Sequence, residues 1–461
     1  MWIKHRLAKL VTMNRREFIK NTGMGAVALG TGLAGCRQAS KKSARANEEP
    51  ATMEMRTNPG NGDKVSLLGY GCMRWPMEPD ENGKDKIVQD TVNQLVDRAL
   101  EGGVNYFDTS PAYLQGQSER AAGIALSRHP RSRYFLATKL SNFRDASKEA
   151  TFKMYHDSFE DLQTDYLDYY LLHSIGRGGY EKFAERYVDN GAIDFLMKER
   201  EKGTIRQLGF SFHGSKEQFD ILLPLHSKYH WDFVQIEMNY VDWKHADGVR
   251  NVNADYLYEE IDKLGIPMVV MEPLLGGRLA APPKNVVDLM KEREPDRSAA
   301  SWAMRFVGTY PSILTSLSGM TYMEHLEENL DTFTGFNPLT AEELEFLERM
   351  AVLIKEYPMV NCTNCKYCMP CPYGIDIPEI FKHYNSCVSD GSIPQSASQK
   401  SFRKLKRAYL ESYLKAVPKE RQADHCIGCG QCMVHCPQSI PIPSELQRID
   451  RYVDRLKRED L

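Results

Sequence analysis

The feature that most constrains the fold is a regular alternation of short apolar runs and amphipathic stretches between Lys64 and Phe333. The apolar runs have the length of buried strands, and the stretches between them have the spacing of helices. The eight predicted strands are Val65–Gly69, Val104–Phe107, Tyr134–Lys139, Tyr166–His173, Gln207–Phe210, Phe233–Glu237, Pro267–Met271 and Ile313–Leu317. Eight such units in about 270 residues predict an α/β fold, a (β/α)8 or TIM barrel.

An open, doubly wound sheet is the structural alternative. Its usual glycine fingerprint is absent after the first strand, because Gly69-Tyr70-Gly71-Cys72 lacks the third glycine. The unit after the fourth strand is enlarged, and Ser174 to Gly203 is long enough for an extra helix over the barrel mouth. The predicted helices include Ile87–Leu100, Ser118–Ser127, Thr151–Leu162, Gln218–Leu223, Tyr256–Leu264 and Ser298–Val307.

Length and charge limit the classes of protein that this chain can belong to. Its 461 residues exceed what a single core usually holds, so we expect two domains and a tail. The formal net charge is only -3 and no long block of one sign occurs, so nothing indicates a nucleic-acid partner. No run of 18 apolar residues is present, which argues against an ordinary membrane-spanning helix.

Reactive side chains stand where consecutive strands of the predicted barrel end. Asp108 ends the second strand, Lys139 the third and His173 the fourth, and Tyr113 follows Asp108 by five residues. In such barrels the chemistry collects at the carboxyl ends of the strands. These four side chains therefore form a candidate catalytic site.

The four side chains suit proton transfer to a carbonyl oxygen. An ammonium such as Lys139 favours the phenolate and so lowers a phenol pKa, while Asp108 can hold the ammonium. His173 can orient a substrate oxygen, and Tyr113 can then act as general acid during hydride transfer from a nicotinamide. Singly, each has a structural alternative: a helix cap, a loop aromatic, a solvated strand end or a satisfied core imidazole.

Several further stretches carry a family resemblance. They are Gly103 to Ser110, Tyr113, Gly116 with Ser118-Glu119, Ala137 to Lys139, Thr164 to Asp168 with His173, Gly203 to Arg206, Leu208 to Ser211, Gly319 and Glu328-Asn329. Over about 270 residues the barrel resembles the aldo/keto reductase family. The resemblance implies that Asp108, Tyr113, Lys139 and His173 are the catalytic tetrad, with Tyr113 as the proton donor.

The resemblance also implies a nicotinamide dinucleotide, NAD or NADP, as cofactor. Ser211 and Gln235 would hold the nicotinamide carboxamide, and the loops after strands seven and eight would hold the phosphates and the adenosine. The residues implied in those two loops are Met271, Leu274, Gly276, Gly319, Met320, Glu328 and Asn329.

Three positions depart from the family pattern. Met271-Glu272 stands where an aromatic residue usually stacks on the nicotinamide, and Phe212 stands where an Asn usually follows the serine. Gly319 to Glu324 offers no cation for a 2′-phosphate, so a preference for NADP over NAD is not indicated.

Eight of the eleven cysteines form two short clusters. Residues 426–437 have the spacing C-x2-C-x2-C-x3-C-P of bacterial ferredoxins, and residues 362–372 have the same trio with one residue fewer before the last cysteine. By the ferredoxin arrangement, one [4Fe-4S] cluster would use Cys362, Cys365, Cys368 and Cys436, and the other Cys426, Cys429, Cys432 and Cys371. Structural zinc and disulfides are the alternatives, although a trio with Cys-Pro is unusual for either. Cys72 and Cys387 stand apart.

The N-terminus has two export patterns in order. Arg15-Arg16 precede a Gly- and Ala-rich run that ends in Leu33-Ala34-Gly35-Cys36. This resembles a twin-arginine (Tat) signal joined to a lipoprotein box, with Cys36 as the lipidated residue and Met1 or Met13 as the start. The alternative is a basic N-terminus followed by a disordered tail.

These patterns predict four regions: a signal at 1–36, a tether at 37–60, the barrel at 61–335, and a mostly helical, ferredoxin-like iron–sulfur domain at 336–461. An aldo/keto reductase barrel joined to such a domain resembles a known bacterial subgroup.

Two functions fit this organisation. The first is a lipid-anchored oxidoreductase outside the cytoplasmic membrane. Its substrate would be a carbonyl compound or an alcohol, with sugars among the candidates. The clusters would relay or store electrons for a redox partner. The second is an electron-transfer or ligand-binding lipoprotein whose barrel has lost reductase activity. Whichever holds, the folded-protein export route suits a chain whose metal cofactor is inserted before export.

Overall fold

The computed structural model describes residues 52–247 and 251–461. The predicted leader, with Arg15, Arg16 and Cys36, lies outside the described residues. No helix within the described ranges is long and apolar enough to span a membrane.

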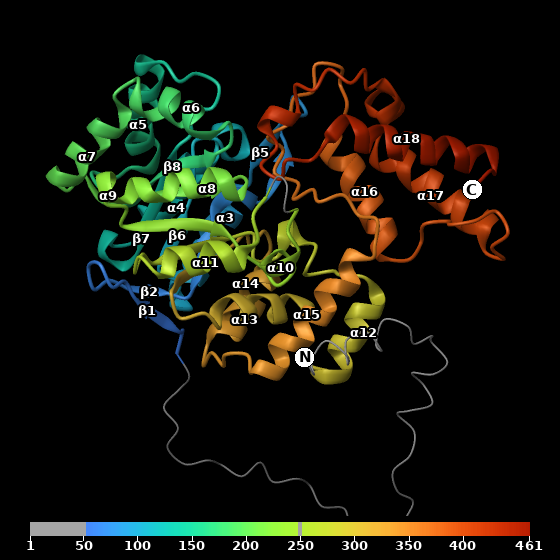
Figure 1. Cartoon of the computed structure of the whole chain (residues 1–461), viewed down its shortest axis with the longest axis horizontal. Coiled ribbons are helices and arrows are strands. Elements are labelled where there is room, and N and C mark those ends of the chain that lie inside the picture. The colour runs from blue at the N-terminus through green and yellow to red at the C-terminus, as the bar shows by residue number, and fades with distance from the viewer. Residues whose placement is uncertain (1–51, 248–250) are drawn as a thin grey trace, which may run out of the picture. The chain divides into compact units, whose positions relative to one another are not determined.

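Eight parallel strands close into a barrel, as the alternating pattern predicts (Figure 1). Each strand pairs with the next one along the chain, and the last pairs with the first. The barrel strands are β3 (Leu68–Gly71), β6 (Tyr106–Asp108), β7 (Phe135–Leu140), β8 (Leu167–Gly176), β9 (Ile205–His213), β10 (Phe233–Glu237), β11 (Met268–Met271) and β12 (Ile313–Ser318). The prediction of a (β/α)8 barrel is confirmed, and the open sheet is excluded.

The first predicted strand is divided between two elements. Val65 belongs to β2 (Lys64–Ser66), which pairs antiparallel with β1 (Met55–Thr57), and the barrel strand β3 starts only at Leu68. A second small hairpin, β4 (Met77–Pro79) with β5 (Asp85–Ile87), was not predicted. Each of these strands has three residues, too few for a period-two pattern to stand out in the sequence.

Helices alternate with the barrel strands. They are α3 (Gln89–Glu101), α4 (Ser118–Leu126), α5 (Lys148–Leu162), α7 (Ala192–Lys202), α8 (Lys216–Leu222), α9 (His226–Tyr229), α10 (Asp242–His245), α11 (Ala254–Asp262), α12 (Lys284–Arg293), α13 (Ala299–Gly308) and α14 (Met323–Phe333). Their apolar faces are buried with the outward-facing strand residues; α3, for example, buries Val92, Leu95 and Val96. Polar caps mark helix starts, since the Ser147 hydroxyl accepts a hydrogen bond from the Ala150 amide at the start of α5.

The enlarged unit after the fourth strand contains more than the usual single helix. Strand β8 continues to Gly176, and α6 (Gly179–Phe183) and a π-helical turn, η4 (Ala184–Val188), precede α7. The predicted extra helix is therefore present, and Arg186 in the π-turn reaches back to the end of β8.

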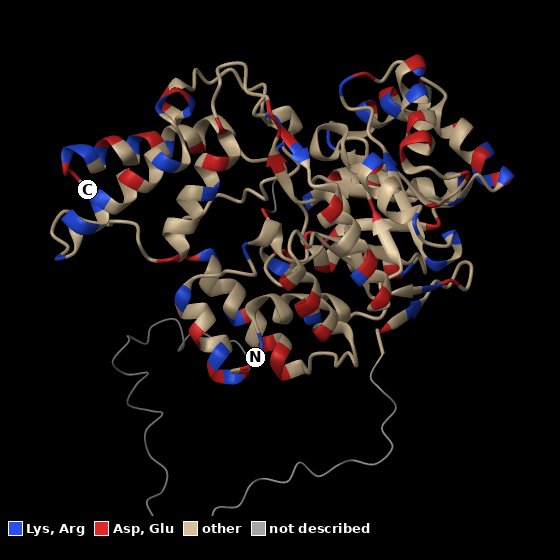
Figure 2. Ribbon diagram, turned by 180° about the vertical axis from the view of Figure 1, so that it is seen from behind, with Lys and Arg blue, Asp and Glu red and all other residues tan. Residues whose placement is uncertain are grey.

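The last helices divide between two cores. Helix α15 (Ala341–Lys355) buries Leu347 and Ile354 in the same core as the barrel helices. A second core forms from α16 (Ile377–Ser389), α17 (Phe402–Ala416) and α18 (Ile442–Arg458), together with the cysteine loops between them. Figure 2 shows basic and acidic positions interspersed on these C-terminal helices.

Candidate functional site

The barrel brings the four predicted catalytic residues to one place. Strands β6, β7 and β8 are direct neighbours, with Asp108 paired to Ala137 and Lys139 paired to Leu171. Tyr113 lies in η2 (Tyr113–Gly116), the short turn after β6. Parallel neighbours end at the same edge, so the side chains of Asp108, Lys139 and His173 meet there.

Asp108 and Lys139 form a buried ion pair. The Lys139 ammonium donates to the Asp108 carboxylate and, at 3.0 Å, to the Thr109 carbonyl oxygen. Burial lowers the pKa of Lys139 and raises that of Asp108, because each charge loses its water, and the mutual attraction opposes both shifts. The second oxygen of Asp108 has no hydrogen-bond partner in the described residues, so the pair is the main compensation of both charges.

The Tyr113 phenol stays protonated in this setting. Burial raises its pKa well above the ordinary value, and the nearby Asp108 carboxylate raises it further. This corrects the expectation that Lys139 lowers the pKa of Tyr113: the Lys139 ammonium lies 5.1 Å from the centre of the phenol ring, but Asp108 neutralises it. The Tyr113 phenol is therefore protonated and can act as a proton donor, beside an ammonium whose charge Asp108 balances.

His173 is neutral and fixed by two hydroxyl groups that the sequence reading missed. Its Nδ1 lies 2.5 Å from the Ser141 hydroxyl and 3.3 Å from the Ser110 hydroxyl. Burial first, then Lys139 and Arg186, lower its pKa well below the ordinary value. When a serine hydroxyl donates to Nδ1, the ring proton resides on Nε2, so the imidazole can donate to a substrate oxygen. Ser141 lies directly after β7, and extending the strand-end reading by two residues would have found it.

The residues implied for the nicotinamide carboxamide fit that group in part. The Gln235 amide oxygen is buried and has no partner within the described residues, which leaves an acceptor for a carboxamide N–H. The Ser211 hydroxyl accepts from the Ser174 amide at 2.7 Å and still has its own proton to donate. Phe212 packs outward on Phe219, with ring centres 5.0 Å apart, so it does not replace the missing Asn at the site.

The loop implied for the phosphates is already engaged. The Gly276 amide donates a hydrogen bond at 2.5 Å to the Glu272 carboxylate. A Cβ on Gly276 would lie 2.4 Å from the Thr363 Cα, so this glycine packs directly on the first cysteine segment. Met271 and Leu274, which precede Gly276 in the same loop, are half-buried. The residues implied for the carboxamide thus keep polar groups for it, whereas the Gly276 amide, in the loop implied for the phosphates, is already hydrogen-bonded.

The loop after strand eight also differs from expectation. The Met320 carbonyl oxygen accepts from the Tyr70 hydroxyl at 2.5 Å, and the Asn329 amide donates to the Ser318 hydroxyl at 3.0 Å. Glu328 is exposed. A cation does lie beside Gly319: the side chain of Arg74, from the loop after β3, packs on this glycine. Sequence reading confined to the strand-eight loop could not find it.

Three acidic and basic groups surround the same end of the barrel. Burial raises the pKa of Glu272 to about 7, with Glu237 adding to the effect, and burial raises that of Glu237 to about 7. The Glu237 carboxylate accepts from the Gln438 amide at 2.6 Å and lies 3.6 Å from the His213 ring. Burial and then Arg177 lower the pKa of His213 to about 4. Arg74 and Arg177 lie close enough to shift the pKa values of Glu272 and His213, so the charge at this end of the barrel is mixed rather than acidic.

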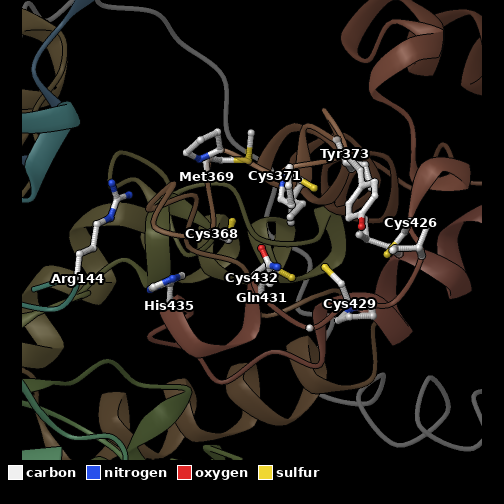
Figure 3. Close-up of a pocket in the computed structure, with 18 of the residues that line it drawn as sticks. Arg144, Cys368, Met369, Cys371, Tyr373, Cys426, Cys429, Gln431, Cys432 and His435 are labelled. Carbon is white, nitrogen blue, oxygen red and sulfur yellow. The ribbon is translucent and has the colours of Figure 1, made fainter.

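The eight clustered cysteines surround two cavities. One is lined by Cys362, Cys365, Cys368 and Cys436, and the other, of about 440 Å³, by Cys368, Cys371, Cys426, Cys429 and Cys432. Figure 3 shows Cys371, Cys426, Cys429 and Cys432 around the larger cavity, with Arg144 and His435 at its other side. The fourth cysteine of each run thus joins the trio of the other run, as the ferredoxin arrangement implies.

These cavities suit clusters better than single ions. A cubane holds its four thiolates around a cage, whereas the ligands of one zinc ion converge on a point. Among residues 52–247 and 251–461, no three His, Cys, Asp or Glu side chains converge in that way. All ten described cysteines are free thiols, so disulfides do not account for the runs. Cys72 is buried in the barrel core, and Cys387 lies near His383, away from both cages.

Hydrogen bonds join the cysteine loops to the barrel's strand ends. Arg74 donates to the Thr363 carbonyl oxygen, and Arg177, just after β8, donates to the Cys436 carbonyl oxygen and, at 3.2 Å, to that of Met433. Arg278 donates to the Asn361 side chain at 3.0 Å. The loops that carry the cysteines are therefore the same loops that close over the barrel site.

A closed eight-stranded barrel with a proton-donating site at its strand ends, followed by a domain with two cysteine cages, defines an oxidoreductase with an iron–sulfur domain. The aldo/keto reductase family model matches residues 67–351, so the chain belongs to the aldo/keto reductase family. A model described as a 4Fe-4S dicluster domain matches residues 361–441. Both the predicted family and the predicted iron–sulfur domain are confirmed.

Relatives resemble the barrel over most of their own length. L-galactose dehydrogenase of Arabidopsis thaliana is 25% identical over 329 residues, covering 68% of this chain and 97% of that protein. An uncharacterized oxidoreductase of Bacillus subtilis, YqkF, is 24% identical and covers 62% of this chain and 92% of its own.

Solved structures share the barrel fold. The holo form of the aldo-keto reductase AKR11C1 from Bacillus halodurans has a TM-score of 0.52 at 23% identity, covering 65% of this chain and 96% of that one. An aldo-keto reductase from Klebsiella pneumoniae in complex with NADPH has a TM-score of 0.51 at 21% identity, covering 65% and 95%. At this level of identity the likeness concerns the fold.

Proposed function

We propose that the chain transfers hydride between a nicotinamide dinucleotide and a carbonyl or alcohol substrate, with Asp108, Tyr113, Lys139 and His173 as its catalytic residues. One observation carries the proposal: the four side chains converge at neighbouring strand ends, with the phenol protonated and the imidazole neutral. Each group is in the protonation state that reduction of a carbonyl requires.

The roles follow from charge and geometry. His173 donates from Nε2 to the carbonyl oxygen and orients it. Tyr113 gives its proton to that oxygen as negative charge develops, which is favourable because an alkoxide is far more basic than a phenolate. Lys139, 5.1 Å from the phenol ring centre, stabilises the phenolate that remains, and Asp108 keeps Lys139 charged in its buried position.

The dinucleotide, when bound, supplies the hydride. Gln235 and Ser211 would hold its carboxamide, through the unpartnered amide oxygen and the free hydroxyl proton. We propose that either NAD or NADP can serve. The Klebsiella structure contains NADPH, and Arg74 beside Gly319 supplies a cation in the loop implied for the adenosine, which both favour NADP. The Arg74 guanidinium already donates to the Thr363 carbonyl oxygen, however, which leaves NAD equally suitable.

The substrate range that we propose includes sugars, as the name of the Arabidopsis relative, L-galactose dehydrogenase, suggests. The two cysteine cages are proposed to bind two [4Fe-4S] clusters, which give the protein a one-electron relay or store served by a redox partner. Support comes from the position of the first cysteine segment, whose Tyr367 ring lies 6.3 Å, centre to centre, from that of His173 in the hydride site.

Export by the twin-arginine route, followed by lipid attachment at Cys36 on the outer side of the cytoplasmic membrane, is also proposed. The support is the order of Arg15-Arg16, the Gly- and Ala-rich run and Cys36 in the sequence. Replacing both arginines with lysine should retain the protein in the cytoplasm, and Cys36→Ser should release it from the membrane fraction. Equal membrane recovery of all three forms in cell fractionation would reject the export proposal.

The hydride proposal is tested on protein purified without oxygen. NADH and NADPH oxidation is followed with simple aldehydes and aldoses, for wild type and Tyr113→Phe. We expect turnover in wild type and its loss in the variant. Equal rates in the two proteins would show that the tetrad is not catalytic.

One observation favours a second function, an electron-transfer or ligand-binding lipoprotein with an inactive barrel. In the loop that the family resemblance implies for the phosphates, Thr363 packs on Gly276 and Glu272 accepts the hydrogen bond of the Gly276 amide. This alternative predicts no dinucleotide in a denatured extract of the purified protein and no measurable NADH or NADPH binding. Recovery of either dinucleotide in stoichiometric amount would exclude it.

A further inference from the structure

The first cysteine segment contributes an aromatic residue to the barrel site. Tyr367 stands between Cys365 and Cys368 in sequence, yet its ring packs near His173 and Phe143 of the barrel. The ring centres of Tyr367 and His173 are 6.3 Å apart, and those of Tyr113 and His173 are 5.9 Å apart. Both phenol rings stand nearly perpendicular to the imidazole, at 75° and 84°. Both phenol rings therefore lie at a similar distance from the imidazole that would hold a substrate oxygen.

The Tyr367 hydroxyl group is available to a ligand. The Tyr367 side chain is only half-buried, and its hydroxyl group is not among the buried polar atoms of the described residues that lack a hydrogen-bond partner. Tyr367 is near enough to Tyr113 to help raise the pKa of Tyr113, as is Glu272. A half-buried phenol can give its O–H to water in the free protein and to a bound substrate instead. Tyr367 can therefore pair with a substrate hydroxyl group.

Contacts of the residues just before Tyr367 hold its segment at the barrel. Arg74 binds the Thr363 carbonyl oxygen, and the Lys366 ammonium lies 3.7 Å from the Asp85 carboxylate. Thr363 also packs directly on Gly276. Because the segment is fixed before and beside Tyr367, the ring position is a property of the docked loop rather than of one free side chain.

We propose that Tyr367 is a substrate-binding residue that selects carbonyl compounds with a hydroxyl group on the carbon next to the carbonyl. The inference rests on the proposed hydride transfer at the tetrad and names the substrate class of that site. Tyr113 and His173 hold the carbonyl oxygen, and Tyr367 hydrogen-bonds the neighbouring hydroxyl. A site built to pair with a substrate hydroxyl discriminates against the analogue without it, because its own polar group is then left unpaired.

Two aldehydes of the same chain length, one with and one without the neighbouring hydroxyl group, distinguish selection by Tyr367 from a general effect on carbonyl reduction. Initial rates are measured without oxygen with glyceraldehyde and with propanal, for wild type and Tyr367→Phe. We expect the variant to raise KM for glyceraldehyde about tenfold, the size expected for one lost hydrogen bond, and to leave propanal unchanged. The phenylalanine keeps the ring contacts with His173 and Phe143, so folding is preserved.

Tyr373→Phe is the matched control. It makes the same change in the same cysteine segment, but at an exposed ring that lines the second cage instead of the tetrad. Iron and sulfide content should equal that of wild type in both variants, and Tyr373→Phe should treat the two aldehydes as wild type does. A rise in KM for both aldehydes in Tyr367→Phe, or for neither, would overturn the proposal.

A binding measurement keeps the inference separate from the hydride proposal. Glycerol, a non-reacting polyol, is added to oxidised wild type and Tyr367→Phe, and its saturation-transfer NMR signal is compared. We expect a signal in wild type that falls several-fold in the variant. If Tyr113→Phe leaves turnover unchanged, the hydride proposal fails while the glycerol signals still decide the role of Tyr367. Equal glycerol signals in the two proteins would refute that role.

Discussion

The barrel and the cysteine domain hold their reactive side chains in opposite ways. Asp108, Lys139 and His173 extend from three strands that hydrogen-bond to one another. The eight clustered cysteines lie in turns and irregular loops between helices, where the described backbone forms no strand. The barrel site is therefore preorganised by backbone pairing, whereas the cages depend on what the cysteines bind.

The two regions meet at one place, and there the difference matters. The barrel supplies the proton donor and the cysteine segment supplies Thr363 and Tyr367, so a rigid half and a metal-dependent half face one another. Bound clusters can therefore affect the barrel site through loop position alone.

Removing the proton donor should have the largest effect. Tyr113→Phe should lower kcat for carbonyl reduction by about 10²- to 10⁴-fold, the usual contribution of a positioned acid, with little change in folding. Tyr170→Phe is the control, since Tyr170 is another buried phenol of the same barrel with an unpartnered hydroxyl group. A loss of similar size in both variants would assign the effect to packing.

Breaking the buried ion pair should destabilise the barrel. Asp108→Asn leaves the Lys139 ammonium buried without its counter-charge. This should lower the free energy of unfolding of the barrel, measured with urea, by about 3 to 5 kcal/mol. Asp157→Asn, in an exposed pair with Lys153, should change stability little. Similar losses at the two sites would mean that burial does not set the value of the Asp108–Lys139 pair.

Removing iron should affect the two regions unequally. Chelation under reducing conditions should accelerate amide hydrogen exchange in residues 361–371 and 426–437 by about 10²-fold, because these loops have few backbone hydrogen bonds of their own. Exchange in β7 and β8 should stay slow. Equal acceleration in strands and cysteine loops would show that the barrel, too, depends on the metal.

The smallest predicted effect is a loss of barrel stability at higher pH. Glu119 is buried, and burial raises its pKa to about 7 from an ordinary 4.5. The folded state thus binds this proton more tightly than the unfolded state, so stability is fully present below the unfolded pKa and is lost as pH rises through the folded pKa. The loss should be about 1.4 kcal/mol between pH 6 and pH 8.

Glu119→Gln should remove that part of the pH slope, measured by urea unfolding at several pH values. Glu237 and Glu272, with pKa values also raised to about 7, should leave the remaining slope. An unchanged slope in Glu119→Gln would mean that Glu119 stays ionised in the folded protein.

Much of this architecture could be read from local patterns. The eight strands, the strand-end positions of Asp108, Lys139 and His173, and the spacing of the cysteine runs all follow from short-range periodicity. The boundary of the first strand was less accessible, because β2 and β3 are separated by a single residue, Leu67. Ser141 was not predicted as a site residue, because it lies two residues beyond Lys139, the predicted end of its strand.

Other features required residues that are distant in sequence. The proximity of Arg74 to Gly319, of Thr363 to Gly276, and of Tyr367 to His173 joins segments more than 85 residues apart. No local pattern encodes such distances. The pKa of Tyr113 is raised rather than lowered as predicted, because burial and Asp108 outweigh the Lys139 charge.

Strand periodicity, cysteine spacing and short motifs are local properties of the chain, and they were enough to predict the barrel, the family and the candidate site. How that site is enclosed depends on contacts between distant segments. Closure of the barrel aligned the strand ends, and docking of the cysteine segment through the Thr363 carbonyl oxygen placed Tyr367 beside His173. Burial then fixed the protonation states, since the loss of water around a charged or polar group depends on everything packed against it.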